Sequence, residues 1–261
     1  MKYFYKPINV FLVSLTLFLN WSLCHSLSFA EQIININLEK EIKKGNFLIG
    51  LKQYLGKNRN NEDSLILKTN KKFLRVVSAN GLKHHSKEVK IVFKKISLEK
   101  PYISEKLVSK PLASFESAKK QSQLLVEQGL RPKITMPSHW EIWLPMENKD
   151  KVNQNFKIRR TIVKSEIIPF LINKYTFQKL DGPISISSDD VIKINNINYG
   201  NNFYLTKDSY GTWTLVQKLS FAEYLKGVLP HEIGSNSPLE ALKAQAVIAR
   251  TWGIYNSNRF E

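Results

Sequence analysis

The sequence predicts an α+β fold: a strand-rich N-terminal region, then a small α/β module, then a β unit that leads into two capped helices. Three observations support this prediction. Short runs of β-branched and aromatic residues alternate with polar turns over residues 33–109 and again over 162–219. A pattern of helix, strand, hairpin and strand lies between these two regions. Two serines in helix-capping sequences follow the second region. The chain has 261 residues, 43% of them hydrophobic, which is enough for two domains.

Residues 1–30 have the form of a secretory signal peptide. Two lysines come first, an apolar run over 10–19 follows, and the small residues Ser28 and Ala30 precede a cleavage point. Cleavage there would remove Cys24, the one cysteine of the chain, so the mature protein would have no disulfide and no cysteine-ligated metal. The apolar run is short for a membrane span, and an uncleaved anchor is the alternative. The sequence therefore predicts an exported cell-envelope protein (periplasm or cell wall) that touches a membrane only through an uncleaved signal segment.

The chain is strongly basic, with a formal net charge of +17. Such an excess suits a polyanionic partner, which could be a nucleic acid, an anionic membrane surface or an acidic wall polymer. Export argues against nucleic acid and favours the wall. The alternative explanation is a biased composition, because Lys, Asn and Ile are spread along the whole chain rather than clustered.

Residues 31–109 are predicted to form a scaffold of short strands. Buried strands are expected over 47–51, 73–77 and 89–93, with Asn80–Gly81 as a tight turn between the last two. No motif in this region points to chemistry.

Residues 110–150 predict a small α/β module. Ser114 can cap a helix that Gly129 ends, and strands are expected over 133–135 and 140–144 with a turn between them. This order resembles part of a SPOR-type repeat, whose known members bind glycan strands stripped of their peptides. The resemblance implies glycan binding by this segment.

Three tryptophans are candidates for stacking on sugar rings. Trp140 and Trp143 are predicted to share one face of a strand, and Trp213 lies in a later strand. The alternative for the first pair is a place in the hydrophobic core.

Strands return over residues 162–219, separated by turns that contain Asp, Asn and Gly. This pattern indicates a compact, mostly antiparallel β unit. The predicted strands cover 184–186, 191–194, 202–205 and 212–216.

A short helix is predicted directly after these strands. Ser220 opens a capping box, the helix covers about 221–228, and Pro230 stops it. Glu232 then lies on a loop over residues 230–236.

A second helix follows that loop. Ser237 opens another capping box, Pro238 takes the first helical position, and the helix runs to about Tyr255. Its small residues predict close packing on several sides, and therefore a central place in the fold. These residues are Ala241, Ala244, Ala246, Ala249 and Gly253.

This layout offers a loop carboxylate, Glu232, with cations beside it. Lys243 and Arg250 lie two turns apart on one side of the second helix, Gln245 lies on a neighbouring side, and His231 adjoins the acid. A carboxylate near a helix N-terminus is normally held ionised, whereas a general acid needs partial burial among apolar neighbours. From the residues alone, Glu232 is either a solvated loop acid or a catalytic one.

Two segments closely resemble the signature of the SpoIID/LytB (stage II sporulation protein D) family. They are YLKGVLPHE over 224–232 and PLEALKAQAVIARTW over 238–252. The family pattern is YLxGVVPxE followed by EALKAQAVAARTY, and the family domain would cover 162–261. This sequence departs from the pattern at Leu229, Ile248 and Trp252, and it has His231 at the variable position where family members usually have a small residue.

The resemblance implies that Glu232 is the catalytic acid and that Lys243 and Arg250 are needed or lie close by. Either cation could bind substrate or hold the loop, and pairing with Glu240 or with the loop backbone is the equal alternative. His231 could orient the acid or be incidental, and Gln245 is a further supporting candidate.

The resemblance also implies a lytic transglycosylase that acts on peptide-stripped peptidoglycan glycan strands. Some family members are described as enhancers of a wall amidase, so a glycan-binding or partner-modulating protein without turnover is the alternative. Members of the family continue beyond the region that matches residues 238–252, so a domain incomplete at its C-terminus is expected. No cofactor and no metal site is predicted.

Overall fold

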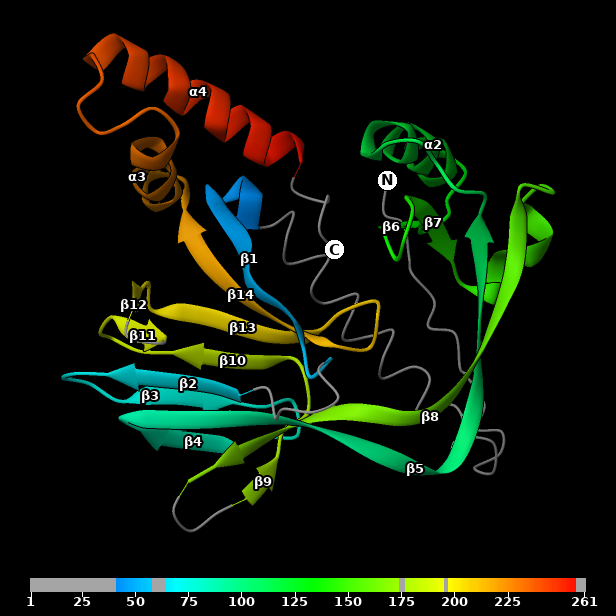
Figure 1. The fold of residues 1–261 in the computed structure, drawn as a ribbon, viewed down its shortest axis with the longest axis horizontal. Helices are drawn as coiled ribbons and strands as arrows, with labels where there is room; N and C mark the ends of the chain where they lie inside the picture. Colours follow the sequence, from blue (N-terminus) through cyan, green and yellow to red (C-terminus); the bar gives the residue numbers. More distant parts are fainter. Residues whose placement is uncertain (1–40, 58–63, 174–176, 195–196, 257–261) are drawn as a thin grey trace, which may run out of the picture. The chain divides into compact units, whose positions relative to one another are not determined.

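The computed structural model describes residues 41–57, 64–173, 177–194 and 197–256, and shows two antiparallel sheets together with the helices labelled α2, α3 and α4 (Figure 1). The predicted signal peptide lies outside the described residues. The strands are β1 Asn46–Leu55, β2 Ser64–Thr69, β3 Leu74–Val77, β4 Lys83–Ser86, β5 Glu88–Ser109, β6 Lys133–Thr135, β7 Glu141–Leu144, β8 Phe156–Ile172, β9 Phe177–Lys179, β10 Ile184–Ser187, β11 Ile192–Ile194, β12 Ile197–Tyr199, β13 Asn202–Lys207 and β14 Trp213–Ser220. The helices are α2 Phe115–Glu127, α3 Phe221–Glu232 and α4 Leu239–Tyr255, with a 3-10 helix η1 Met146–Lys151. The predicted α+β class is confirmed.

The main hydrophobic core is built from both sheets. The first sheet has the strand order β1-β14-β13-β10-β3-β4, and the second has the order β12-β11-β2-β5-β7-β6, with β8 paired to β5 and β9 to β8. Alternate residues of each strand face inward, as the pleat requires. Fully buried examples are Leu65, Leu67 and Ile91 from the second sheet and Val76, Ile186, Leu205 and Leu215 from the first.

Strands from the two predicted β regions pair with each other. Within the first sheet, β1 pairs with β14 and β3 pairs with β10, and within the second, β11 pairs with β2. The described strands of the predicted regions 31–109 and 162–261 therefore share both sheets. Local sequence patterns gave no sign of these pairings, because each one joins residues more than 100 positions apart.

The predicted turn at Asn80–Gly81 forms, with a φ of 85° at Gly81, but it joins β3 to β4 rather than to the strand that begins at residue 88. The sequence of β4 is KHHS, which contains none of the β-branched or aliphatic residues that mark a strand. This short strand was therefore missed, and its existence depends on pairing with β3.

The segment from β5 to β8 contains the predicted α/β module. As predicted, Ser114 caps α2 and Gly129 follows the helix with a φ of 77°; the structure adds that the cap is a complete capping box with Ser117. The chain order β5-α2-β6-β7-η1-β8 and the strand order β8-β5-β7-β6 describe a split β-α-β arrangement, with η1 in place of a second helix. Glycan binding by this SPOR-like segment stays a prediction.

A buried carboxylate ties this module to β8. Glu141, which is 4% exposed, accepts two hydrogen bonds of 2.9 Å from the guanidinium of Arg159 and one of 2.9 Å from the indole N–H of Trp143. Burial raises the pKa of Glu141, but the hydrogen bonds and positive charge of Arg159, together with the Trp143 bond, outweigh burial and lower it. The carboxylate is therefore held ionised inside the protein.

This arrangement predicts a pH-dependent contribution to stability. A lowered carboxyl pKa stabilises the fold above the usual pKa of 4.5, and the contribution is lost as the pH falls through the lowered value. Because Arg159 remains 41% exposed and solvent screens the pair, we expect Glu141→Gln to lose about 1–2 kcal/mol of unfolding free energy at neutral pH. Urea unfolding of both proteins between pH 3 and 7 measures the difference. A difference that is as large at pH 3 as at pH 7 would contradict the assignment.

Candidate functional site

The helix α3 begins as predicted but ends later. The hydroxyl of Ser220 accepts a hydrogen bond from the backbone N–H of Glu223, whose carboxylate accepts one from the Ser220 backbone N–H at 2.8 Å. The prediction that Pro230 stops the helix is wrong. A proline removes one N–H from the ladder, but the residues after it still donate to carbonyls one turn back. The helix ends at Glu232, just before Gly234 adopts a φ of 82°, so the acid closes a helix instead of lying on a loop.

The predicted capping box at the start of α4 is also wrong. The hydroxyl of Ser237 donates to the carbonyl of Ile233 at 2.5 Å, and the carboxylate of Glu240 pairs with Lys243 at 2.8 Å. Both side chains of the expected box are therefore engaged elsewhere, and Pro238 occupies the N-cap position without a side-chain cap. The predicted end of this helix is confirmed.

An aromatic cluster anchors both helices to the first sheet, where α3 follows β14 directly and lies against β1 (Figure 1). Phe47 of β1 is 3% exposed, and its ring lies 4.5 Å from that of Phe221 and 4.8 Å from that of Tyr224. Gly253 of α4 comes so close to Phe47 that a Cβ there would lie 2.9 Å from the ring. The absence of a side chain at Gly253 is therefore what lets α4 approach β1.

The candidate acid lies between the two helices. Glu232 is exposed, without the partial burial that favours a general acid, and its Oε2 accepts a hydrogen bond from the side-chain amide of Gln245 on α4. Tyr224 of α3 interacts electrostatically with this carboxylate. Burial raises the pKa of Tyr224, and the negative charge of Glu232 raises it further. The acid therefore has an amide from one helix and a phenol from the other as neighbours.

Tyr224 was not predicted as part of this site. It precedes Glu232 by eight residues, which in a continuous α-helix places both on one side. Because the helix was predicted to stop at Pro230, Tyr224 was assigned to a helix and Glu232 to a loop. The structure shows that both belong to one helix, and only then does the spacing indicate that they lie on one side.

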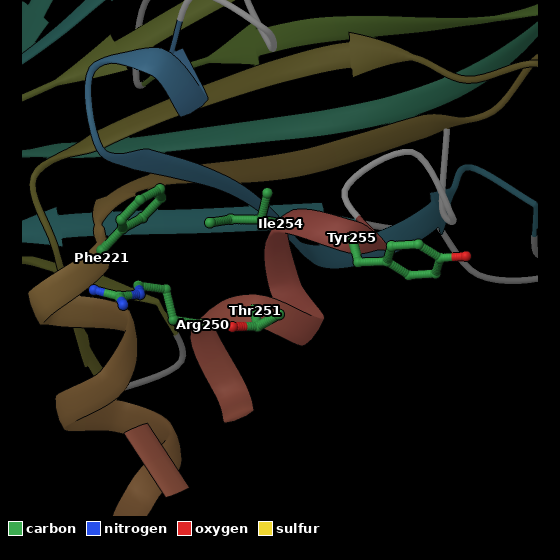
Figure 2. Close-up of a pocket in the computed structure, with 5 residues that line it drawn as sticks. All are labelled: Phe221, Arg250, Thr251, Ile254 and Tyr255. Atoms are coloured by element: carbon green, nitrogen blue, oxygen red, sulfur yellow. The ribbon is translucent and has the colours of Figure 1, made fainter. Parts of the chain in front are cut away.

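The predicted cations do not bond to the acid. Lys243 is exposed and pairs with Glu240, as the structural alternative expected, and His231 is an exposed neighbour of Glu232. Arg250 forms no hydrogen bond or ion pair within the described residues and lines a surface pocket (Figure 2). Figure 2 shows its guanidinium on the side of the pocket nearer Phe221, while the ring of Tyr255 points away. The pocket is lined by Phe221, Arg250, Thr251, Ile254 and Tyr255.

The predicted central position of α4 is wrong for the structure described. Of its small residues, Ala249 is buried and Gly253 meets Phe47, but Ala241 and Ala244 are exposed. Small residues permit close packing only where a neighbour exists, and one side of α4, here called its outer side, is largely exposed. That side includes Val247, Ile248 and Trp252, which are 54%, 59% and 50% exposed.

The prediction that Trp140 and Trp143 share a face is wrong. The ring of Trp140 packs 5.4 Å from that of Phe115, whereas Trp143 lies 5.8 Å from the ring of Tyr210 with the ammonium of Lys106 3.5 Å from its centre. Side chains alternate along a strand, so a spacing of three residues places them on opposite faces.

Two of the three tryptophans are part of the interior. Trp143 is 9% exposed, and Trp213 is 5% exposed with its indole N–H donating to the carbonyl of Ile167 at 2.9 Å. Neither ring presents a free face for a sugar. Trp140 is half-buried, and sugar stacking there stays a prediction.

Within the described residues, no group of three or more His, Cys, Asp or Glu side chains is placed to hold a metal ion. The described part of the chain also contains no helix with the length and apolar character needed to cross a membrane.

The segment that forms this site matches a known protein family. Residues 209–261 fit the SpoIID family, described as Stage II sporulation protein. This SpoIID-matching segment contains the whole of β14, α3 and α4, and therefore both partners of the Glu232–Gln245 contact. The suspected resemblance is thus confirmed for the C-terminal part of the chain.

A curated protein of Brachyspira hyodysenteriae (strain ATCC 49526 / WA1), whose description is "Uncharacterized protein", is 40% identical to the chain over 74 residues. The similarity covers 28% of this chain and 20% of that protein, so the chain spans about a fifth of the length of this relative. No solved structure matches the chain significantly.

Proposed function

We propose that this protein is a lytic transglycosylase that cleaves peptide-stripped glycan strands of peptidoglycan, with Glu232 as general acid and base. The observation that carries the proposal is the place of Glu232 in the SpoIID-matching segment, at the end of α3 and facing α4.

The other acids of the two helices are already engaged. Glu223 closes the capping box of α3, and Glu240 pairs with Lys243. Glu232 has a neutral amide as its partner and, within the described residues, no ion pair. An acid that must gain and lose a proton during a reaction is better served by a neutral partner than by a cation, which would hold it ionised.

One carboxyl group is enough for the proposed chemistry. Protonated Glu232 would donate its proton to the glycosidic oxygen as the C1–O bond breaks, and positive charge would develop on the muramic sugar. The resulting carboxylate would take the proton of the C6 hydroxyl of the same sugar, whose oxygen closes a 1,6-anhydro ring on C1. The sugar supplies the nucleophile, so no second carboxylate and no activated water is required, unlike in glycosidases with paired acids.

The decisive experiment is mass spectrometry of the products after incubation of the protein with peptide-stripped glycan strands. Fragments with 1,6-anhydro ends support a transglycosylase, hydrolytic ends point to a different reaction, and intact strands retained by the protein point to binding without turnover. The reaction also requires export, for which residues 1–30 have the appropriate form.

Arg250 is the proposed contact for the charge of the substrate. Peptide-stripped muramic sugars expose a lactyl carboxylate, and the guanidinium of Arg250 lines a pocket while having no partner among the described residues. We expect Arg250→Gln to raise KM for stripped strands about tenfold and to leave kcat nearly unchanged. Lys120→Gln, which removes one positive charge from the exposed side of α2, is the control. Equal KM values for the two variants would exclude this role of Arg250.

A second candidate function is that of a non-catalytic glycan-binding protein or an enhancer of a wall amidase. The exposed apolar side of α4 favours it, because uncovered apolar surface of this kind is typical of protein contacts. Wild-type protein that stimulates an amidase without releasing anhydro products would support this alternative.

A further inference from the structure

The side chain of Gln245 meets Glu232 across the gap between two helices. Gln245 lies on α4 and is half-buried, and its Nε2 donates to Oε2 of Glu232 at the end of α3. The position of Gln245 is itself fixed, because Ala249, one turn further along α4, is buried and Gly253 is seated on Phe47. Gln245, on an anchored helix, therefore restrains the carboxylate of Glu232, which as an exposed group would otherwise rotate freely.

An amide has a property that no charged side chain shares. It carries two N–H donors and a carbonyl acceptor, so it can donate to an ionised carboxylate or accept from a protonated one. The change between the two requires only a rotation about the last side-chain bond of Gln, whose torsional preference is broad and roughly two-fold. An ammonium or guanidinium group has donors alone and would favour the ionised acid at every step.

We propose that Gln245 is a positioning residue of this site, whose amide holds the carboxyl of Glu232 in place in both of its protonation states. The inference rests on the proposed transglycosylase function, in which Glu232 first gives up a proton and then takes one back. Misplacement of a catalytic group by about 1 Å can lower a rate by about 100-fold, so a device that keeps the acid in one place through both steps has a large effect on turnover.

Two variants separate the parts of this proposal. Gln245→Met keeps the length and helix preference of the side chain but removes the hydrogen bond, and Gln245→Lys keeps a donor while removing the acceptor. We expect both to lower kcat on stripped strands by about 10- to 100-fold, with KM changed less than about twofold. Gln123→Met, at an exposed position in the middle of α2, is the matched control and is expected to behave as wild type. Wild-type kcat in Gln245→Lys would overturn the claim that both protonation states are held, and wild-type kcat in Gln245→Met would overturn the role altogether.

A second measurement does not depend on turnover. The charge of Glu232 contributes to the raised pKa of Tyr224, after burial, so the titration of Tyr224, followed by NMR in ¹³C-tyrosine protein, reports where the carboxylate lies. We expect Glu232→Gln to lower the pKa of Tyr224, and Gln245→Met to lower it in the same direction as the released carboxylate moves into solvent. The remaining titratable or charged groups of the two helices are Glu223, Lys226 and His231 on α3 and Glu240, Lys243, Arg250 and Tyr255 on α4.

The kinetic measurement and the Tyr224 titration test different claims, so failure of the proposed function can be told apart from failure of the positioning role. Absence of turnover in the wild type would refute the proposed function, while a Tyr224 titration that shifts in Gln245→Met would still establish the positioning contact. A Tyr224 titration that shifts in Glu232→Gln but stays unchanged in Gln245→Met would overturn the contact, even in an active enzyme. Circular dichroism and the urea midpoint of each variant identify any loss of fold, for which Gln123→Met sets the reference.

Discussion

Replacing Glu232 by Gln is expected to lower the release of anhydro-ended fragments by about 100- to 10,000-fold, the usual contribution of a general acid and base. The substitution keeps the size of the side chain and its ability to bond with Gln245, but Gln has no proton to give to the glycosidic oxygen. Because Glu232 is exposed at the end of α3, little loss of stability should accompany the effect. Mass spectrometry of stripped strands after incubation with each protein measures the release of anhydro-ended fragments.

The control is Glu240→Gln. This acid is exposed, lies in the first turn of α4 and pairs with Lys243, so its replacement removes the same negative charge from the same pair of helices. We expect the control to retain nearly full turnover. Equal activity of Glu232→Gln and wild type would refute the proposed mechanism. An equal loss of turnover in Glu232→Gln and Glu240→Gln would indicate an effect of charge rather than of a specific acid.

Replacing Gly253 by Leu is expected to destabilise the attachment of α4 and to lower turnover with it. The added side chain would begin 2.9 Å from the ring of Phe47, and that ring cannot move aside because Phe221 and Tyr224 pack against it. Overpacking of this kind lowers the free energy of unfolding by about 1–3 kcal/mol. Because Leu is a good helix former, such a decrease would result from packing rather than from helix preference. Urea unfolding gives the change in free energy, and hydrogen exchange of the α4 amides shows whether the helix detaches.

A second glycine provides the matched control. Gly227 lies in α3 at an ordinary helical φ, and a Cβ there would meet nothing within 4 Å. Gly227→Ala should therefore stabilise the protein by about 0.5–1 kcal/mol, because alanine restricts the unfolded chain and favours the helix. If Gly253→Leu were as stable as wild type while Gly227→Ala gained stability, the close approach of α4 to Phe47 would not be needed.

The candidate site was only partly predictable from the sequence. The segment over 224–252 pointed to the family and to Glu232, and the structure then brought Gln245 to that acid. The role of Tyr224 was hidden by the expected stop at Pro230, which assumed that a proline ends a helix wherever it occurs. In the last turn of α3 the missing N–H costs one hydrogen bond, and the helix continues past it to Glu232.

The sequence by itself determined the features that depend on neighbours a few residues away. These features are the helix cap at Ser114, the capping box at Ser220, the left-handed glycine at 129 and the strands over 133–135 and 141–144, which follow from local hydrogen bonding and side-chain alternation. The tertiary structure alone decided which distant segments meet. The pairing of β1 with β14 carries Phe47 to the two helices, and the interior encloses Trp143 and Trp213, which the sequence offered as sugar-stacking residues. Burial and contact between distant residues depend on the packing of the whole chain, and a local pattern reports only which faces are apolar, not what will cover them.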